Sequence, residues 1–185
     1  MAAKKHRKVV LFIEGTTDDT NGDLRQGFIK LLEKEASLQG KMPRIVLGNG
    51  ISQTIDKFKN AHEDHKFVMV DMDGDYNKRE EKLKFHKVEN EDTFFMVQAV
   101  EAWFLSQPLV LNAFYKKDLS DKIIKKEASE FSKPDKELQR ITKDTVRKEY
   151  HKVRHAVELL PLLDAKKLAQ DFPDYKRLIE TLTKI

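Results

Sequence analysis

Three aspartates at alternate positions follow a short apolar run near the middle of the chain. Residues 67–70 (FVMV) are apolar, and Asp71, Asp73 and Asp75 come directly after them. An apolar run of this length, bounded by charged residues, is typical of a strand that is buried on both faces. Carboxylates gathered at one point repel one another unless a cation lies among them, and their hard oxygen atoms suit Mg²⁺ or Mn²⁺. We therefore predict a metal site at the end of this strand.

A second apolar, β-prone run also ends in an acid. Residues 9–13 (VVLFI) are followed by Glu14, and Asp18 comes four residues later. The carboxyl ends of parallel strands share one edge of a sheet, where ligands bind. We therefore expect Glu14, Asp71 and Asp73 to converge, while Asp18 taken alone is more typical of a turn. A metal held there would bridge phosphate oxygens and activate water, and a nearby carboxylate would move a proton.

The order of the elements predicts the sheet that would bring these acids together. Four apolar strand-like runs alternate with helical patterns, at residues 9–13, 44–47, 67–70 and 93–97. This alternation favours an α/β fold with a mainly parallel sheet flanked by helices. Beyond residue 109 strand patterning is lacking, and helices are expected at residues 109–115, 119–131, 136–142, 150–163 and 175–182. We predict an α/β core over residues 1–106 and a helical C-terminal extension over residues 107–185 packed on it.

The composition limits the classes of protein that fit. The chain has 185 residues, of which 39% are hydrophobic and 36% charged, so we expect a soluble protein with one main core. No run approaches the ~18 apolar residues of a membrane span, and we expect neither a signal peptide nor a membrane partner. The lack of cysteine excludes disulfides and makes the cytoplasm the default location. A net charge of +4 permits a nucleic-acid partner without establishing one.

One glutamate stands among apolar residues on a predicted helix over residues 98–105. Val97, Val100 and Leu105 border Glu101 on that helix. A carboxylate inside an apolar arc is costly unless it is paired or ligated. Glu101 would therefore complete the metal site or pair with a basic residue of the C-terminal helices, and both interpretations remain open. Trp103 on the same helix is expected to be a core residue.

The C-terminal half offers one lysine for the chemistry. Lys152 borders the apolar side of a basic predicted helix, and a lysine near catalytic metals can stabilise developing charge. A solvated basic face is the simpler interpretation of the same pattern. The six histidines form no cluster on the predicted strands, and a Walker-type phosphate loop is missing, so neither a histidine zinc site nor an ATPase is expected.

Two other motif families share part of the aspartate pattern. An EF-hand loop starting at Asp71 would need glycine and glutamate where Tyr76 and Lys82 stand, so it is rejected. A haloacid-dehalogenase-like small-molecule phosphatase also has an apolar strand followed by Asp-x-Asp-Gly. In this chain, however, Asp75 replaces the usual threonine, and two strand–helix units precede the motif. The phosphatase is therefore kept as an alternative.

The same acids carry a resemblance to a known family. Glu14-Gly15 after the first strand and Asp71-x-Asp73 after the third resemble the Toprim domain of topoisomerases, primases and overcoming-lysogenization-defect nucleases. In that family the glutamate acts as general acid or base and shares metal binding with the aspartate pair. The run EGTTD resembles the nuclease branch, where an acid at the position of Asp18 joins the metal site. The resemblance thus implies Mg²⁺ (or Mn²⁺) bound by Glu14, Asp18, Asp71 and Asp73.

The resemblance covers nearly the whole chain. Residues 94–108 (FFMVQAVEAWFLSQP) look like the Glu-Ala-Trp signature of small stand-alone Toprim-like proteins of unknown function, and residues 133–141 and 149–182 look like their C-terminal half. It implies Mg²⁺-dependent phosphodiester hydrolysis of nucleic acid with Glu14 as general acid or base. From their own sequence patterns, Glu101 and Lys152 are added as candidate catalytic residues. The resemblance also implies an ATPase partner protein in prokaryotic defence or repair. The alternative from another class is a partner-dependent or non-catalytic nucleic-acid-binding effector subunit.

Overall fold

Four parallel strands form the sheet at the centre of the molecule. The computed structural model describes residues 9–16, 21–123, 127 and 130–185. The strands are β1 (Val9–Gly15), β2 (Arg44–Asn49), β3 (His65–Asp71) and β4 (Thr93–Met96), in the spatial order β2-β1-β3-β4. β1 and β3 are central and apolar through their middles, as expected for strands covered on both faces. The predicted α/β fold with a parallel sheet is confirmed, in an arrangement consistent with a Toprim-like fold.

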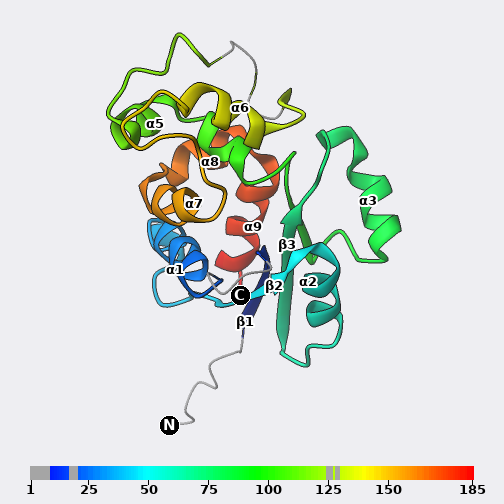
Figure 1. The fold of residues 1–185 in the computed structure, drawn as a ribbon. Helices are drawn as coiled ribbons and strands as arrows, with labels where there is room; N and C mark the ends of the chain where they lie inside the picture. The colour runs from blue at the N-terminus through cyan, green and yellow to red at the C-terminus, as the bar shows by residue number, and fades with distance from the viewer. Residues whose placement is uncertain (1–8, 17–20, 124–126, 128–129) are drawn as a thin grey trace.

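Helices cover both faces of the sheet. The α-helices are α1 (Asn21–Leu32), α2 (Gly50–Lys59), α3 (Arg79–His86), α4 (Glu101–Leu105), α5 (Pro108–Tyr115), α6 (Pro134–Thr142), α7 (Arg154–Leu159), α8 (Ala165–Asp171) and α9 (Pro173–Thr183). Short 3₁₀ helices occur at η1 (Ala36–Leu38), η2 (Tyr76–Lys78) and η4 (Leu160–Leu162). In Figure 1, α2 and α3 lie on one side of the sheet, and α1, α7 and α9 lie on the other. The helical C-terminal part therefore covers one face.

Several predicted helix boundaries were wrong. Helix α1 ends at Leu32, and η1 follows it after a break. The described residues of the segment 119–131 are not in an α-helix. The helix predicted from residue 150 begins at Arg154, and α8 was not predicted. Local capping explains α8, because the Asp164 side chain accepts hydrogen bonds from the backbone amides of Lys166 and Lys167 at 2.9 and 3.2 Å.

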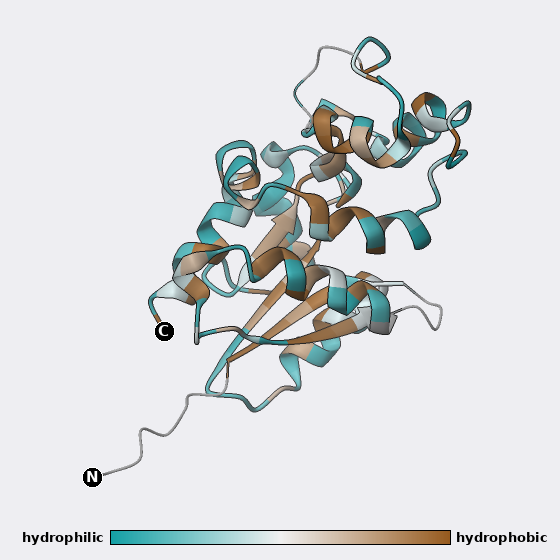
Figure 2. Cartoon of the chain, turned by 90° about the vertical axis from the view of Figure 1, so that its left-hand side faces the viewer, coloured by the Kyte–Doolittle hydropathy of each residue, from teal (hydrophilic) through white to brown (hydrophobic). Residues whose placement is uncertain are grey.

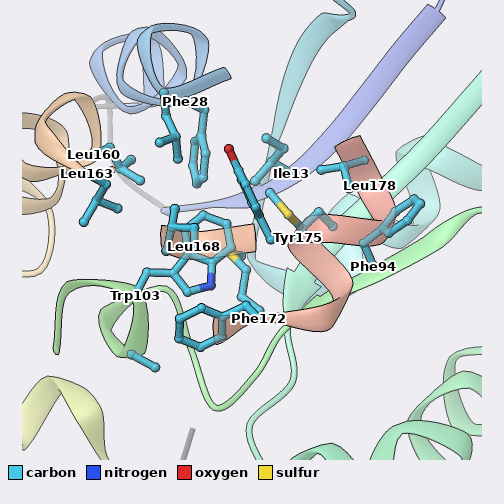
Figure 3. Packing of buried hydrophobic residues seen from close by; sticks show 14 of the residues in the cluster. Ile13, Phe28, Phe94, Trp103, Leu160, Leu163, Leu168, Phe172, Tyr175 and Leu178 are labelled. Carbon is cyan, nitrogen blue, oxygen red and sulfur yellow. The ribbon is translucent and has the colours of Figure 1, made fainter. Parts of the chain in front are cut away.

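The core joins the two halves of the chain around Trp103. Its ring centroid lies 6.5 Å from that of Phe28 in α1, 6.2 Å from Phe172 and 5.4 Å from Tyr175 in α9 (Figure 3). Trp103 is 1% exposed, which confirms it as a core residue. Figure 2 shows the brown, hydrophobic strands enclosed by helices with teal outer surfaces. The sheet and the C-terminal helices therefore share one buried apolar cluster.

A buried ion pair fastens α9 to the edge of the sheet. Asp174, which is 1% exposed, accepts hydrogen bonds from the Nε atom of Arg79 at 3.2 Å and from the backbone amide of Phe95 in β4 at 2.8 Å. Arg79 and Arg177 both donate to the carbonyl oxygen of Thr93. These side chains satisfy backbone groups on the outer edge of β4, a position that otherwise leaves strand hydrogen bonds unmade.

The described part of the chain contains no helix that combines the length and the apolar character needed to cross a bilayer.

Candidate functional site

Two acids from adjacent strands meet at the carboxyl edge of the sheet. Ile13 in β1 pairs with Met69 in β3, so Glu14 and Asp71 follow this pair by one and two residues. The Oε2 atom of Glu14 accepts a hydrogen bond from the backbone amide of Asp71 at 2.9 Å. Asp71 is 8% exposed, and its Oδ1 atom accepts from the backbone amide of Val100 at 3.0 Å. The predicted convergence of Glu14 and Asp71 is therefore present.

The loops that leave β3 and β4 are fastened to each other beside these acids. Asp73 and Gln98 both adopt left-handed backbone conformations, with φ of 49° and 61°. The amide of Asp73 donates to the carbonyl of Gln98 at 2.9 Å, and the amide of Gln98 donates to the carbonyl of Gly74 at 2.9 Å. Left-handed backbone is tolerated by aspartate better than by most residues. The pairing fixes the Asp-x-Asp loop against the start of α4, and the helix begins at Glu101 rather than at residue 98.

Glu101 faces the site from the first turn of α4 and is completely buried, at 0% exposure. Its Oε1 atom accepts a hydrogen bond from the hydroxyl of Tyr150 at 3.1 Å. Its Oε2 atom is buried and has no hydrogen-bond partner among the residues that the structure describes. A buried carboxylate oxygen without a partner is costly, which marks this atom as one that a ligand could satisfy.

Lys152 supplies positive charge opposite the acids. Burial alone would lower the pKa of its ammonium group, but the carboxylates of Glu101, Asp71 and Glu14 outweigh burial and raise the pKa above its ordinary value of 10.5. Lys152 therefore remains charged at neutral pH. It lies two residues after Tyr150, whose hydroxyl is also 3.3 Å from the carbonyl oxygen of Lys152.

Three acids of the site, the half-buried Glu14 and the buried Asp71 and Glu101, hold protons more tightly than ordinary carboxylic acids. Burial, together with the charge of Asp73, raises the pKa of Glu14 from 4.5 to about 7. Burial first, and then the charges of Glu14 and Glu101, raise the pKa of Asp71 well above 3.8. Burial also raises the pKa of Glu101, although Lys152 opposes the increase. The charge of Lys152 therefore does not offset the negative charge of these acids. A cation bound beside them would lower their pKa values.

The donor atoms at this edge are of the chemical type that hard divalent cations prefer. In the described segments, no three acidic or histidine side chains are already gathered into a complete metal-binding group. Glu14, Asp71 and Glu101 each use one carboxylate oxygen in a hydrogen bond, and within the described residues the second oxygen of Glu101 has no partner. All of these atoms are carboxylate oxygens, as Mg²⁺ and Mn²⁺ prefer, and Glu101 is within electrostatic reach of Asp71 and Glu14.

The other acids considered for the site are Asp73, Asp18 and Asp75. Asp73 is exposed on the loop beyond β3, yet its charge reaches Glu14 and Asp71. Asp18 lies outside the residues that the structure describes. Asp75 caps η2, because its side chain accepts from the backbone amide of Asn77 at 3.0 Å, and this gives it a structural role.

Sequence reasoning missed Tyr150 as a residue of the site. Its hydroxyl fixes one oxygen of Glu101 across 49 positions of the chain, and its own backbone amide donates to the hydroxyl of Thr142 at 2.8 Å. Nothing in the local pattern around residue 150 indicates that partner. Of the two interpretations of Glu101, an ion pair with a basic residue is not formed within the described residues, although Lys152 is within electrostatic reach; the metal site stays a prediction.

Comparison with known proteins identifies one family. No significant match was found among curated proteins, and none among solved structures. The model of a family described as a domain of unknown function (DUF4276) matches residues 13–183, which include every described acid of the site. Because the match extends over most of the chain, this protein belongs to the DUF4276 family.

Proposed function

We propose that this protein is a cytoplasmic Mg²⁺- or Mn²⁺-dependent phosphodiesterase that cleaves nucleic acid, as the Toprim resemblance implies. The observation that carries the proposal is the buried Glu101 carboxylate, with one unpartnered oxygen, beside Glu14 and Asp71. A cluster of buried acids with raised pKa values is costly to a fold and is typical of functional sites. Its place at the carboxyl edge of a parallel sheet is where such folds bind ligands.

The residues divide into roles by burial and charge. Asp71, Asp73 and Glu101 would hold the metal through oxygen atoms, together with Glu14. A metal held by these residues would supply Lewis acidity toward a phosphate group and a water molecule. Glu14 suits proton transfer, because a pKa of about 7 lets it both accept and release a proton near neutral pH. Lys152 stays charged and would stabilise negative charge that develops on the phosphate.

A cleavage assay tests the proposal. Wild-type protein is incubated with labelled single-stranded and duplex DNA and RNA in Mg²⁺ or Mn²⁺, with EDTA as the metal-free control. Asp71→Asn should lose activity by a factor of about 100 or more, since it removes a carboxylate at the centre of the site. Asp75→Asn is the matched control, because it makes the same chemical change four residues along and asparagine can still cap η2.

Three results are distinguishable. Metal-dependent cleavage that Asp71→Asn abolishes and Asp75→Asn retains supports the proposal. Nucleic-acid binding without cleavage by the pure protein contradicts the stand-alone enzyme and favours the partner-dependent effector. Cleavage that persists in Asp71→Asn would assign the activity to a contaminant or to another site.

A further inference from the structure

Helix α3 leaves the carboxyl edge of the sheet and presents a basic face with an exposed aromatic ring. The chain passes from Asp71 through Gly74 and η2 directly into α3, which lies outside the sheet on the same side as α2 (Figure 1). The side chain of Lys78 lies over Gly74, since a Cβ atom placed there would be 3.1 Å from the Cδ atom of Lys78. The basic face therefore starts next to the Asp-x-Asp loop.

Helical geometry gathers the relevant side chains on one side of α3. Lys78, which ends η2 and precedes α3, stands four residues before Lys82 and seven before Phe85, a spacing that places the three side chains on one side of the helix. His86 borders that face, and its pKa is lowered first by burial and then by the charges of Lys82 and Lys59, while the charge of Asp73 opposes them. Lys82 and Asp73 are thus each within electrostatic reach of His86.

The positive charge on this face is not neutralised. Within the described residues, Lys78 and Lys82 form no ion pair, whereas Arg140, Arg147 and Lys167 on other elements each have an acidic partner. Glu80 falls on the opposite side of α3, and Glu81 borders the basic face. Two unpaired lysines one turn apart repel each other, and a bound phosphate chain would relieve that repulsion.

Phe85 gives the face an aromatic surface that the core does not use. Its side chain is 77% exposed, and its ring meets that of His86 edge-on at 5.0 Å. Leaving a phenyl ring in water has no benefit for folding, because the hydrophobic face of α3 is supplied by Leu83, which is 6% exposed. An exposed ring beside lysines is the usual platform on which an unpaired base stacks.

We propose that the α3 face formed by Lys78, Lys82 and Phe85 binds single-stranded nucleic acid and leads the strand to the acids at the sheet edge. The lysines would contact phosphates, and Phe85 would stack on a base. Stacking requires a base that is not paired, so a single strand fits this face and a duplex does not. The inference rests on the proposed function only for what happens to the strand once it reaches the acids.

The test measures binding without cleavage. Fluorescence anisotropy with labelled oligo-dT and oligo-U in EDTA, using the full chain, gives affinities over a range of salt concentrations. Phe85→Ala should weaken binding by about tenfold through lost stacking. Lys82→Gln should weaken binding and reduce the slope of log K against log salt by about 0.7. Separate measurements on DNA and RNA strands show which sugar the site accepts.

Matched variants control for charge and hydrophobicity. Lys84→Gln makes the same charge change on another side of α3, and Leu109→Ala removes another exposed apolar side chain, 81% exposed, on α5. Both should bind like wild type. The inference is overturned if wild type does not bind single strands, if duplex binds as tightly, or if the controls weaken binding equally. The binding assay contains no metal, so its result does not depend on whether the protein is a nuclease. If wild type cleaves nucleic acid but Phe85→Ala and Lys82→Gln bind single strands as tightly as wild type, the inference about α3 is overturned while the proposed function stands.

Discussion

The carboxylate of Glu101 combines complete burial with an unsatisfied oxygen. Tyr150 holds the Oε1 atom, and the Oε2 atom has no partner in the described part of the chain. Folding alone does not account for this arrangement, because an apolar residue of similar volume would be at least as stable there. The arrangement is consistent with a binding site whose acids lower the free energy of unfolding of the metal-free protein and serve to bind a ligand.

Replacing Glu101 by glutamine should separate stability from metal binding. Glu101→Gln keeps the hydrogen bond to Tyr150 and removes a buried charge, so the metal-free protein should be unchanged or stabilised by about 1 kcal/mol. Mn²⁺ should then raise the melting temperature of wild type and raise that of the variant far less. Thermal unfolding with and without Mn²⁺ measures both effects. Equal stabilisation of the two proteins by Mn²⁺ would remove Glu101 from the site.

Stability should depend on pH in a direction set by Glu14. Its pKa is about 7 in the folded protein and near 4.5 when exposed, so between these values the unfolded chain loses a proton that the folded protein retains. Rising pH therefore favours unfolding across this window. The free energy of unfolding of wild type relative to Glu14→Gln should fall by roughly 2–3 kcal/mol from pH 4.5 to 7, since one pKa unit corresponds to about 1.4 kcal/mol.

Urea unfolding of both metal-free proteins at several pH values measures that difference. A difference that stays constant, or that increases with pH, would show that burial does not hold a proton on Glu14. Asp73→Asn offers a second comparison, because the charge of Asp73 is one cause of the raised pKa of Glu14.

Among single residues, the sequence predicted those that stand out from their immediate neighbours in the chain. Glu14 and Asp71 each follow an apolar run, and strand pairing then brings them together. Glu101 stood out because it interrupts an apolar arc. The partner of Glu101 could not be predicted, since Tyr150 reaches it through the packing of α4 against α6 and the segment before α7. Contacts made by tertiary packing leave no periodic trace in the sequence.

At the scale of elements, α9 is attached to the sheet by charge as well as by apolar packing. Asp174 receives hydrogen bonds from Arg79, Arg177 and the amide of Phe95. This network covers the outer edge of β4, and it ties α3 and α9 to the same strand. The position of α3 beside the site therefore depends on a helix near the end of the chain.

Removing the buried carboxylate should destabilise the fold strongly. Asp174→Ala leaves Arg79 buried without a counter-ion and should lower the free energy of unfolding by about 3–5 kcal/mol. Glu180→Ala on the same helix is the control, because its pair with Lys176 is exposed and 3.9 Å long, and it should cost less than about 1 kcal/mol. Urea denaturation compares the two variants. Similar costs would mean that the network adds little to stability.

Helices and strands were predicted well where the apolar pattern was strong. They were predicted poorly where a capping side chain determines the position of a helix. All four strands are confirmed, because each contains a short apolar run rich in β-branched or aromatic residues and bounded by polar ones. The missed α8 is only seven residues long and depends on the Asp164 cap, and Pro173 separates it from α9. The break after α1 has no proline or glycine to indicate it before Gly40.

At the scale of the whole molecule, the two halves of the chain share their core at Trp103. This residue precedes the C-terminal part, yet its neighbours include Phe172 and Tyr175 near the end of the chain. The acids at the sheet edge also depend on the C-terminal half, because Tyr150 and Lys152, which interact with them, belong to it. Sheet and helical extension should therefore behave as one cooperative unit.

Unfolding monitored by two probes tests this cooperativity. Fluorescence of Trp103, the single tryptophan, reports the junction, and far-UV circular dichroism reports all helices and strands. Both should give the same midpoint in urea, and a fragment of residues 1–106 should not fold stably alone. Two separated transitions, or a folded fragment, would show that the halves are independent.

Calorimetric titration with Mn²⁺ or Mg²⁺ addresses the acids at the sheet edge most directly. Wild type and Asp75→Asn should bind the metal with similar affinity, and Asp71→Asn should lose detectable binding, because a carboxylate among the buried acids is removed. Binding should release protons near pH 7, since the pKa values of Glu14 and Asp71 are raised. Equal binding by wild type and Asp71→Asn, or no binding by either, would contradict a metal centre formed by these acids.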